Sequence, residues 1–415
     1  MDFNVNKVRE RFPALKRTYN GKPVVYFDGP GGTQFLDTAI ESICDYMTNG
    51  GSNRHGKSPT SPVGQKTENL IAKAREDMKV LLNAHNHEVS FGPNATTLMF
   101  HVSRALAKTW SEGDEIILTE LDHHANIDTW RSAAVDRNVV VKYVPVCAKS
   151  LTFDFKALAK LITPKTKLIA VGAASNCIGT TVDVKTVSKM AKEVGALLAV
   201  DAVHAIPHMY VDATELGIDM LFASAYKFFA AHLGMAVIQK DLFKSLDLYK
   251  IAPASDDAPD ALEIGTQNHE GIGSVSAAVQ FIAELGRGDN QKEQLISGYR
   301  AIQEHENAIA DYIRKEMAAI EGITLYQADE SIKKTPTIAF RAEGISPHEF
   351  CVRMCEEHSV FIASGNFYAL TLAERLGIND SGAFIRLGLA IYSTMEEAER
   401  FLEGVRAIVG GTVRT

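Results

Sequence analysis

Short apolar runs alternate with amphipathic segments from residue 24 to about residue 240. The apolar runs, each short enough for a strand, cover residues 24–27, 88–91, 115–118, 139–144, 168–174, 196–200, 220–224 and 235–239. Between them, residues 68–84 and 184–195 carry apolar side chains at three- and four-residue spacing, which predicts helices. This alternation predicts βαβ units and a mostly parallel, doubly wound sheet.

The pattern changes after about residue 285. The predicted elements there are a long charged helix over 292–320, strands over 323–326 and 335–340, a helix over 347–358, a strand over 384–390 and a closing helix over 394–409. The sequence therefore predicts an α/β protein with a large domain at residues 21–285 and a smaller C-terminal α+β domain at residues 286–415. We expect the N-terminal residues 1–20 to belong to the small domain.

Composition narrows the classes of partner. The chain has 415 residues, of which 46% are hydrophobic and 23% charged, and its formal net charge is -8. Because lysine and arginine form no stripe in this sequence, we expect no nucleic-acid partner and favour small molecules instead. The charged N-terminus lacks the apolar core of a secretory signal, and no segment approaches 18 uninterrupted apolar residues. We therefore expect a cytoplasmic protein with no membrane segment.

The five cysteines form neither a CxxC pair nor a metal-ligand spacing. The sequence thus predicts neither a disulfide framework nor a metal site. Cys351 and Cys355 share one face of a predicted helix, where core packing is the favoured interpretation.

An apolar run, Leu221-Phe-Ala-Ser-Ala-Tyr-Lys227, ends on a lysine. In open α/β sheets, ligands bind just outside the carboxyl ends of the strands. A partly desolvated lysine there is a candidate Schiff-base nucleophile for a carbonyl compound. The alternative is a surface lysine that opens a loop.

A second candidate feature is the turn Phe91-Gly-Pro-Asn-Ala-Thr-Thr97, which joins a predicted strand to a predicted helix. Its small residues leave backbone N–H groups exposed at a helix N-terminus, which is an anion site that suits a phosphate. An ordinary capped helix start is the alternative.

Further polar residues follow other predicted strands. Asp201 ends the apolar run 196–200, and a buried carboxylate there implies a cationic partner such as a protonated pyridine nitrogen. Asn176 offers a hydrogen bond to a phenolate oxygen, and His123 offers a ring that stacks on an aromatic cofactor or serves only structure. Arg386 is a lone guanidinium in an apolar strand, so it binds either a substrate carboxylate or a core acid.

These motifs resemble those of the class V aminotransferase family, fold-type I pyridoxal-phosphate enzymes, in its cysteine-desulfurase-like branch. The similar stretches are the phosphate turn and residues 26–32, 121–126, 174–176, 201–205, 224–227, 263–268 and 384–394. The resemblance implies a large, mostly parallel seven-stranded sheet domain, pyridoxal 5'-phosphate as cofactor and an amino acid as substrate.

The resemblance also implies a role for each matched residue. Lys227 bonds covalently to the cofactor, Asp201 pairs with the pyridine nitrogen, and His123 stacks on the ring. Asn176 and His204 approach the phenolic oxygen, and Arg386, with Asn176, binds the substrate. The phosphate-binding residues implied are Ala95, Thr96, Ser224 and Tyr226. Gly265 and Thr266 match a segment that reaches the neighbouring subunit's phosphate, which implies a homodimer with shared sites.

The chain departs from this branch at the loop that carries the sulfur-accepting cysteine. Tyr368 occupies the cysteine position, and Ala363 stands where related desulfurases often carry an arginine. A phenol cannot accept persulfide sulfur, although it is a usable general acid. Cys177 is the one thiol expected near the cofactor, with packing favoured over catalysis. His204 replaces the usual glutamine, and Tyr226 replaces the usual histidine.

These departures leave four functions open. The favoured function is a lyase that removes the α-proton of an amino acid and expels a β-substituent, with C–S bond cleavage and with Lys227, His123 and Tyr368 as catalytic residues. An aminotransferase and an epimerase use the same chemistry at the α-carbon, and a catalytically silent cofactor-binding protein is the fourth. The substrate side chain is expected to contact loops such as residues 50–58 and 365–370, which the sequence alone cannot fold.

Overall fold

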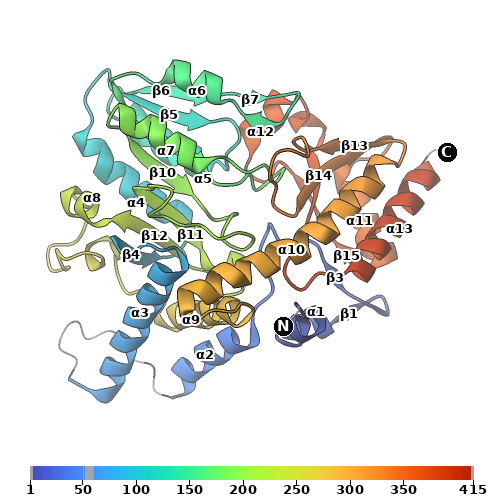
Figure 1. The fold of residues 1–415 in the computed structure, drawn as a ribbon, viewed down its shortest axis with the longest axis horizontal. Helices are drawn as coiled ribbons and strands as arrows, with labels where there is room; N and C mark the ends of the chain where they lie inside the picture. Colours follow the sequence, from blue (N-terminus) through green and yellow to red (C-terminus); the bar gives the residue numbers. More distant parts are fainter. Residues whose placement is uncertain (1–2, 50, 52–59, 413–415) are drawn as a thin grey trace.

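The computed structural model describes residues 3–49, 51 and 60–412, so most of the predicted substrate loop 50–58 lies outside the described residues. A seven-stranded sheet forms the centre of the fold (Figure 1). Its strands, in spatial order, are β4 (His87–Gly92), β12 (Gly234–Gln239), β11 (Met220–Ser224), β10 (Leu197–Asp201), β9 (Thr166–Gly172), β5 (Glu115–Thr119) and β6 (Val140–Val144). The strands from β11 to β6 are parallel and only β12 runs against its neighbours, so the predicted mostly parallel sheet is confirmed.

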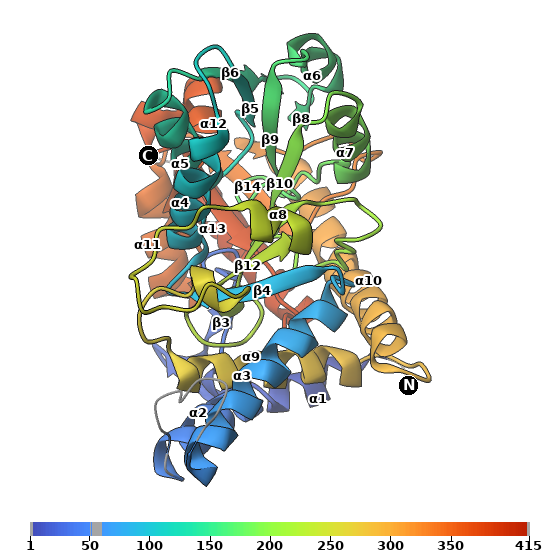
Figure 2. The ribbon, with the colours of Figure 1, turned by 90° about the vertical axis from the view of Figure 1, so that its left-hand side faces the viewer.

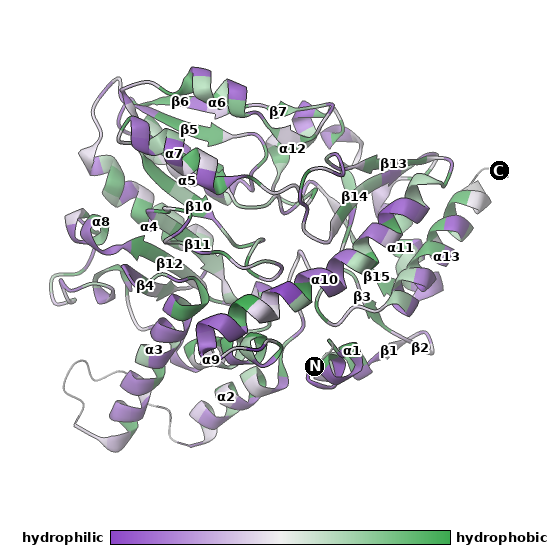
Figure 3. Cartoon of the chain, viewed as in Figure 1, coloured by the Kyte–Doolittle hydropathy of each residue, from purple (hydrophilic) through white to green (hydrophobic). Residues whose placement is uncertain are grey.

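Helices cover both faces of this sheet. Figure 2 shows α4 (Ala95–Leu106) and α5 (Ala125–Val135) on one side, and α6 (Phe155–Leu161) and α7 (Val184–Glu193) on the other. Alternate residues of one strand therefore enter different cores: Leu168 and Ala170 pack with α4 and α5, whereas Ile169 packs on the opposite face. This two-sided burial explains why the strands are continuous apolar runs. Figure 3 shows hydrophobic residues in these strands and hydrophilic residues along α3 (Pro62–Leu81) and α10 (Gln291–Ala318).

A second, antiparallel sheet lies in the C-terminal part of the chain. Its spatial order is β13 (Ile323–Tyr326), β14 (Thr337–Ala342), β17 (Phe384–Gly388) and β16 (Ala363–Gly365). The long α10 (Gln291–Ala318) extends from α9 (His269–Glu284) to this sheet, where it packs against β13 and β14 (Figure 1). Beside it, α11 (Pro347–His358) packs against α13 (Met395–Thr412). Both predicted sheets are thus present, and the domain boundaries at residues 20 and 285 stay a prediction.

The strand expected at residues 24–27 is not part of the seven-stranded sheet. Instead β3 (Val25–Tyr26) pairs in parallel with β15 (Val360–Phe361), and Asp28 forms a bridge to Gly388 of β17. Val25 and Phe27 are buried in the core of the C-terminal sheet, so their apolar side chains complete that core. The segment therefore leads from the C-terminal sheet to the turn at Pro30, which lies next to Lys227.

The remaining elements surround these two sheets. They are α1 (Val5–Glu10), β1 (Thr18–Tyr19), β2 (Lys22–Pro23), α2 (Asp37–Thr48), α3 (Pro62–Leu81), β7 (Val146–Cys147), β8 (Thr152–Phe153), α8 (Lys240–Ser245), α9 (His269–Glu284), α12 (Leu370–Arg375) and short 3-10 turns. Among the described residues, no helix has the length and apolar character needed to cross a membrane.

Candidate active site

Four adjacent strands deliver the predicted polar residues to one edge of the sheet. β11, β10, β9 and β5 are consecutive and parallel. β10 ends at Asp201, and Lys227, Asn176 and His123 follow β11, β9 and β5, respectively. Their carboxyl ends therefore face the same side, where ligands of open α/β sheets bind. The expectation that Lys227 and Asp201 follow neighbouring strands is confirmed by the parallel pairing of β10 with β11.

These strand ends open into a cavity of about 340 Å³. It is lined by Pro30, Gly31, Asn94, Ala95, Thr96, Asp122, His123, Ala125, Gly172, Ala174, Asn176, Asp201, Val203, His204, Ser224, Tyr226, Lys227, Ala363, Phe367, Tyr368 and Arg386. Every predicted site residue except Thr266 is in this set. The cavity lies between the seven-stranded sheet and residues of the C-terminal sheet.

Lys227 lies in a short 3-10 turn directly after β11. Its ammonium donates a hydrogen bond to the carbonyl of Pro30. Burial, and then the nearby positive charge of Arg386, lower its pKa to about 7, although Asp201 and Asp28 act in the opposite direction. A substantial fraction of the amine is therefore unprotonated near neutral pH, which a Schiff-base nucleophile requires.

Asp201 ends β10, and its Oδ1 accepts a hydrogen bond from the Val203 N–H at 2.9 Å. Burial raises its pKa to about 6, and Lys227 lowers it. Among the described residues, no basic side chain forms an ion pair with this carboxylate. A cationic nitrogen that enters the cavity would supply the missing partner.

The opposite end of the cavity has the features of an anion site. Asn94 caps α4 by accepting a hydrogen bond from the Thr97 N–H at 2.8 Å, so Ala95 and Thr96 form the first helical turn. N–H groups in a first turn have no intrahelical acceptor and favour anions. Ser224 at the end of β11 lines the same cavity. Both interpretations of this turn are present together: it is a capped helix start and it borders the cavity.

His123 follows β5 and lines the cavity. Its Nδ1 accepts a hydrogen bond from the Ala125 N–H at 3.0 Å, which leaves the ring proton on Nε2. Burial, Lys227, His124 and Arg386 lower its pKa to about 4. The ring is therefore neutral at physiological pH and can stack on an aromatic group without a charge.

Asn176 and His204 each place an unpartnered atom near the cavity. Asn176 donates from Nδ2 to the Phe367 carbonyl at 2.8 Å, while its Oδ1 is buried without a hydrogen-bond partner among the described residues. The Nδ1 atom of His204 is likewise buried without a hydrogen-bond partner among the described residues. Buried polar atoms without partners are rare, so both indicate a polar ligand.

Arg386 lies on β17 with a side chain that is 5% exposed. One guanidinium nitrogen, Nη1, donates to the Asn176 carbonyl at 2.8 Å, and the guanidinium carbon lies 3.7 Å from the centroid of the Phe367 ring. No acid among the described residues forms an ion pair with it, which argues against the core salt bridge considered above. Burial lowers its pKa to about 10, so it stays charged and suits a carboxylate.

A strained turn carries Tyr368 to the rim of the cavity. Phe367 and Tyr368 both have left-handed backbones, with φ of 53° and 59°, which is costly for bulky residues. Hydrogen bonds from Asn176 Nδ2 to the Phe367 carbonyl and from the His124 N–H to the Tyr368 carbonyl hold this turn. Tyr368 is 72% exposed, and its ring centroid lies 5.2 Å from that of His123. Tyr368 therefore meets the cavity, and its match to the cysteine position stays a prediction.

No cysteine is among the residues that line the cavity. Cys177, next to Asn176, is fully buried in the core, and burial raises its pKa to about 12. A fully buried thiol with a raised pKa forms little of the reactive thiolate, so Cys177 is packed and unreactive.

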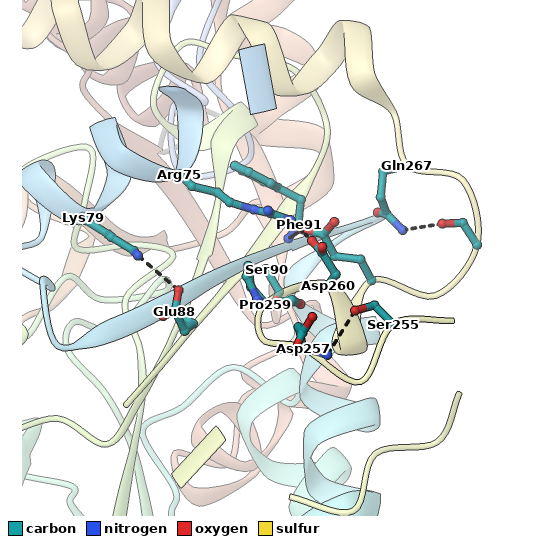
Figure 4. Close-up of polar contacts among 12 residues, drawn as sticks. Arg75, Lys79, Glu88, Ser90, Phe91, Ser255, Asp257, Pro259, Asp260 and Gln267 are labelled. Atoms are coloured by element: carbon teal, nitrogen blue, oxygen red, sulfur yellow. Dashed lines mark hydrogen bonds and ion pairs between the residues drawn. The ribbon is translucent and has the colours of Figure 1, made fainter. Parts of the chain in front are cut away.

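Thr266 lies in an exposed segment away from this chain's own cavity. It borders a different hollow, together with Lys250, Asp257 and Gln267. Arg75 ties the segment to the rest of the chain through ion pairs of 2.8 Å with Asp260 and 2.7 Å with Glu263, and Figure 4 shows this cluster beside Phe91 of β4. Glu263 also accepts a hydrogen bond from the Phe91 N–H. A role for Thr266 in the cavity therefore requires a second chain.

Sequence reasoning missed several cavity residues. Asp122, beside His123, accepts hydrogen bonds from the Gly172 N–H at 2.9 Å and from Asn126 Nδ2 at 2.7 Å. Its place in the motif Leu-Asp-His-His could have indicated it, because it is an acid at a strand end. Nothing in the sequence marks Pro30 and Phe367, because only the tertiary structure brings them to the cavity.

The residues present fit pyridoxal 5'-phosphate. The first turn of α4 suits its phosphate, Lys227 its carbonyl carbon, Asp201 its pyridine nitrogen and the neutral His123 its ring face. The unpartnered atom of His204 suits the phenolic oxygen. Each group of this cofactor thus meets a complementary group of the chain.

Comparison with known proteins decides the family. The model of the family described as aminotransferase class-V matches residues 25–401. The chain belongs to the class-V aminotransferase family. It is therefore a pyridoxal-phosphate-dependent enzyme, a lyase or transferase with a fold of type I.

Relatives of this class-V family member include enzymes named for cysteine desulfuration. The chain is 27% identical over 420 residues to a probable cysteine desulfurase of Halalkalibacterium halodurans, which covers 97% of each protein. It is 27% identical over 424 residues to a cysteine desulfurase of Pectobacterium carotovorum, which covers 98% of each.

Solved structures share the fold. The cysteine desulfurase CsdA of Escherichia coli matches with a TM-score of 0.84 and 22% identity over 99% of both chains. The apo cysteine desulfurase of Thermococcus onnurineus NA1 matches with a TM-score of 0.87 and 23% identity over 98% of both chains.

Proposed function

We propose that this enzyme is a lyase that removes the α-proton of an amino acid and expels a β-substituent, with cleavage of a C–S bond and without a protein thiol. The observation that carries the proposal is the cavity lining, which among the described residues includes Tyr368 and no cysteine. By the resemblance described above, Tyr368 occupies the position of the sulfur-accepting cysteine. Persulfide formation needs a thiolate nucleophile, whereas β-elimination does not.

Arg386 binds the substrate carboxylate. Its guanidinium is buried, charged and held against Phe367 and the Asn176 carbonyl, so it is fixed before the substrate arrives. A bidentate contact to a carboxylate supplies an ion-pair partner, which Arg386 lacks among the described residues. The substrate α-carbon is thereby oriented toward the sheet edge.

Lys227 would hold the cofactor, and its amine is the base that would move the α-proton of the substrate. Its pKa of about 7 makes it an effective base near neutral pH. When bound, the cofactor supplies an electron sink for the charge that develops at the α-carbon. Asp201 would keep the pyridine nitrogen protonated, and the uncharged ring of His123 would cover the face of the cofactor ring.

Tyr368 and His123 stand where a departing group needs a proton. The phenol of Tyr368 and the Nε2–H of His123 are proton donors of residues that line the cavity, and their rings are neighbours. A general acid at this position assists departure of a thiolate. The net reaction converts an S-substituted cysteine and water into a thiol, pyruvate and ammonium.

Transamination and epimerisation use the same base and carboxylate contact, so the products decide among them. A transaminase requires a 2-oxo acid as co-substrate and an epimerase returns the opposite enantiomer. We disfavour a catalytically silent protein, because a pKa near 7 at Lys227 and a buried Arg386 with no ion-pair partner among the described residues are costly to maintain.

We expect a variant with all five cysteines replaced by serine to keep its lyase activity within about twofold, because no thiol takes part. With L-cysteine and reductant, sulfide, pyruvate and ammonium should form in equal amounts in both proteins. Tyr368→Phe should lower kcat by about 10²-fold through the loss of a general acid. Alanine produced with sulfide, and abolished in the cysteine-free variant, would instead establish persulfide chemistry.

The proposed enzyme is a homodimer with shared sites, in which Thr266 of one chain serves the cofactor phosphate of the other. The support is that Thr266 is exposed and borders a different hollow instead of its own chain's cavity. Subunits carrying Thr266→Ala should be mixed with subunits carrying Lys227→Ala, so that each hybrid has one intact site and one doubly altered site. We expect half of the hybrid sites to regain wild-type cofactor affinity, measured by fluorescence titration. Hybrids no better than their parents would show that sites are not shared.

A further inference from the structure

His204 connects the two sheets beside the cofactor cavity. It follows β10, and its Nε2 lies 3.1 Å from Thr335 Oγ1 and 3.0 Å from Thr337 Oγ1, at the start of β14. All three side chains are buried. The other ring nitrogen, Nδ1, is buried with no hydrogen-bond partner among the described residues, and the ring lines the cavity.

The imidazole of His204 is neutral and carries one proton. Burial, and then the charges of His208, Lys227 and Arg386, hold its pKa well below the ordinary range. A neutral imidazole has one N–H donor and one bare acceptor nitrogen. The neighbours of Nε2 therefore decide which nitrogen is the donor.

The hydroxyl protons of the two threonines favour a bare Nε2. Thr335 Oγ1 donates to the Gly179 carbonyl at 3.4 Å, so its proton has an acceptor. For the Thr337 hydroxyl, the hydrogen bonds of the described residues include one acceptor, His204 Nε2. A proton on Nε2 would leave this buried hydroxyl without an acceptor, which is unfavourable. With the proton on Nδ1, both threonine hydroxyls have an acceptor and Nε2 has a donor. The one group left without a partner is the Nδ1–H of His204, whose ring lines the cavity.

We propose that Thr337, with Thr335, is a positioning residue that holds His204 as the Nδ1–H tautomer and so directs one N–H donor toward the phenolic oxygen of the cofactor. A donor to this oxygen favours its deprotonated form. A glutamine, the usual residue here, carries its donor on an amide nitrogen and needs no tautomer to be fixed. A histidine at this position donates to the cofactor only as one tautomer, and the two threonine hydroxyls favour that tautomer.

This arrangement links the cofactor to the second sheet. Thr337 belongs to β14, and Arg314 of α10 donates to the carbonyls of both Thr335 and Thr337, at 2.8 Å and 3.3 Å. The direction of the donor at His204 thus depends on how β14 sits against the seven-stranded sheet. The inference holds for each of the reactions considered above, because it concerns the cofactor and not the substrate.

The tautomer can be read from the protein without cofactor. In apoenzyme labelled with ¹⁵N-histidine, nuclear magnetic resonance distinguishes protonated from bare ring nitrogens, and the His204 signals are those that a His204→Gln variant lacks. We expect a protonated Nδ1 and a bare Nε2 in the wild type and in Thr337→Ser, which keeps the hydroxyl. In Thr337→Val the Nε2-protonated form should gain at least tenfold relative to the wild type. A protonated Nε2 in the wild type would overturn the proposal.

The holoenzyme gives a second readout. Loss of the donor should raise the pH midpoint of the change in the cofactor's visible absorption by about one unit in Thr337→Val, with Thr337→Ser unchanged. Because the threonine acts through the imidazole, Thr337→Val should have no effect in a His204→Gln background. An equal shift in both backgrounds, or none in either, would contradict a positioning role. If Thr337→Val does not fold, the proposal is tested on the wild type and Thr337→Ser. The two quantities measured there are the tautomer of His204 and the pH midpoint of the change in the cofactor's absorption.

Discussion

Replacing Lys227 by alanine should lower the rate of turnover by at least about 10³-fold, because the variant loses both the amine that binds the cofactor and the base that moves the α-proton. The protein should still fold and bind the cofactor without a covalent bond, since the anion site and Asp201 remain. Borohydride should fix the cofactor on one peptide of the wild type, the one that contains Lys227, and on none in the variant. Methylamine should restore part of the activity, because a free amine can replace the missing one.

Lys185→Ala is the matched control. Lys185 is an exposed lysine paired with Glu215 at 2.8 Å, so its loss should leave activity unchanged. Borohydride labelling of another lysine in the wild type would contradict the assignment. The low pKa of Lys227 adds a signed test: its unprotonated fraction should be roughly tenfold larger at pH 8 than at pH 6, and covalent reconstitution of the apoenzyme should accelerate accordingly. A lysine of ordinary pKa would show a low rate at both values.

The seven-stranded sheet could be predicted because its strands are buried on both faces. Continuous apolar runs such as residues 220–224 match β11 to the residue, and polar side chains directly after such runs mark the sheet edge. The strand at residues 24–27 was misplaced for the same reason: its apolar side chains indicate a buried strand but not which sheet buries them.

Contacts between distant segments could not be predicted. The bond between His204 and Thr337 joins residues 133 positions apart, and the left-handed turn at Phe367 depends on a hydrogen bond from Asn176. Neither threonine differs in sequence from a strand threonine with no role. The cavity end formed by strand carboxyl termini was therefore predictable, whereas the end formed by the C-terminal sheet depended on tertiary packing.

Asp201→Asn should lower kcat by about 10²- to 10³-fold while the cofactor stays bound, which is the size of effect expected when a buried charge that stabilises a transition state is removed. The carboxylate ends β10 in a buried position, accepts a hydrogen bond from the Val203 N–H and forms no ion pair with a basic side chain of the described residues. Its negative charge is thus available to a protonated pyridine nitrogen. An amide of the same shape keeps the contact to Val203 but cannot keep that nitrogen charged.

The control for Asp201→Asn lies at the other end of the same strand pair. Asp219 precedes β11, accepts a hydrogen bond from the Leu198 N–H at 2.8 Å and also has a pKa raised by burial, but it does not line the cavity. Asp219→Asn should change thermal stability and leave kcat within about twofold. Reconstituting Asp201→Asn with a cofactor methylated on the pyridine nitrogen, which carries a permanent positive charge, should recover at least tenfold in kcat. If the methylated cofactor recovers nothing while stability and cofactor affinity are intact, Asp201 does not act by holding that charge.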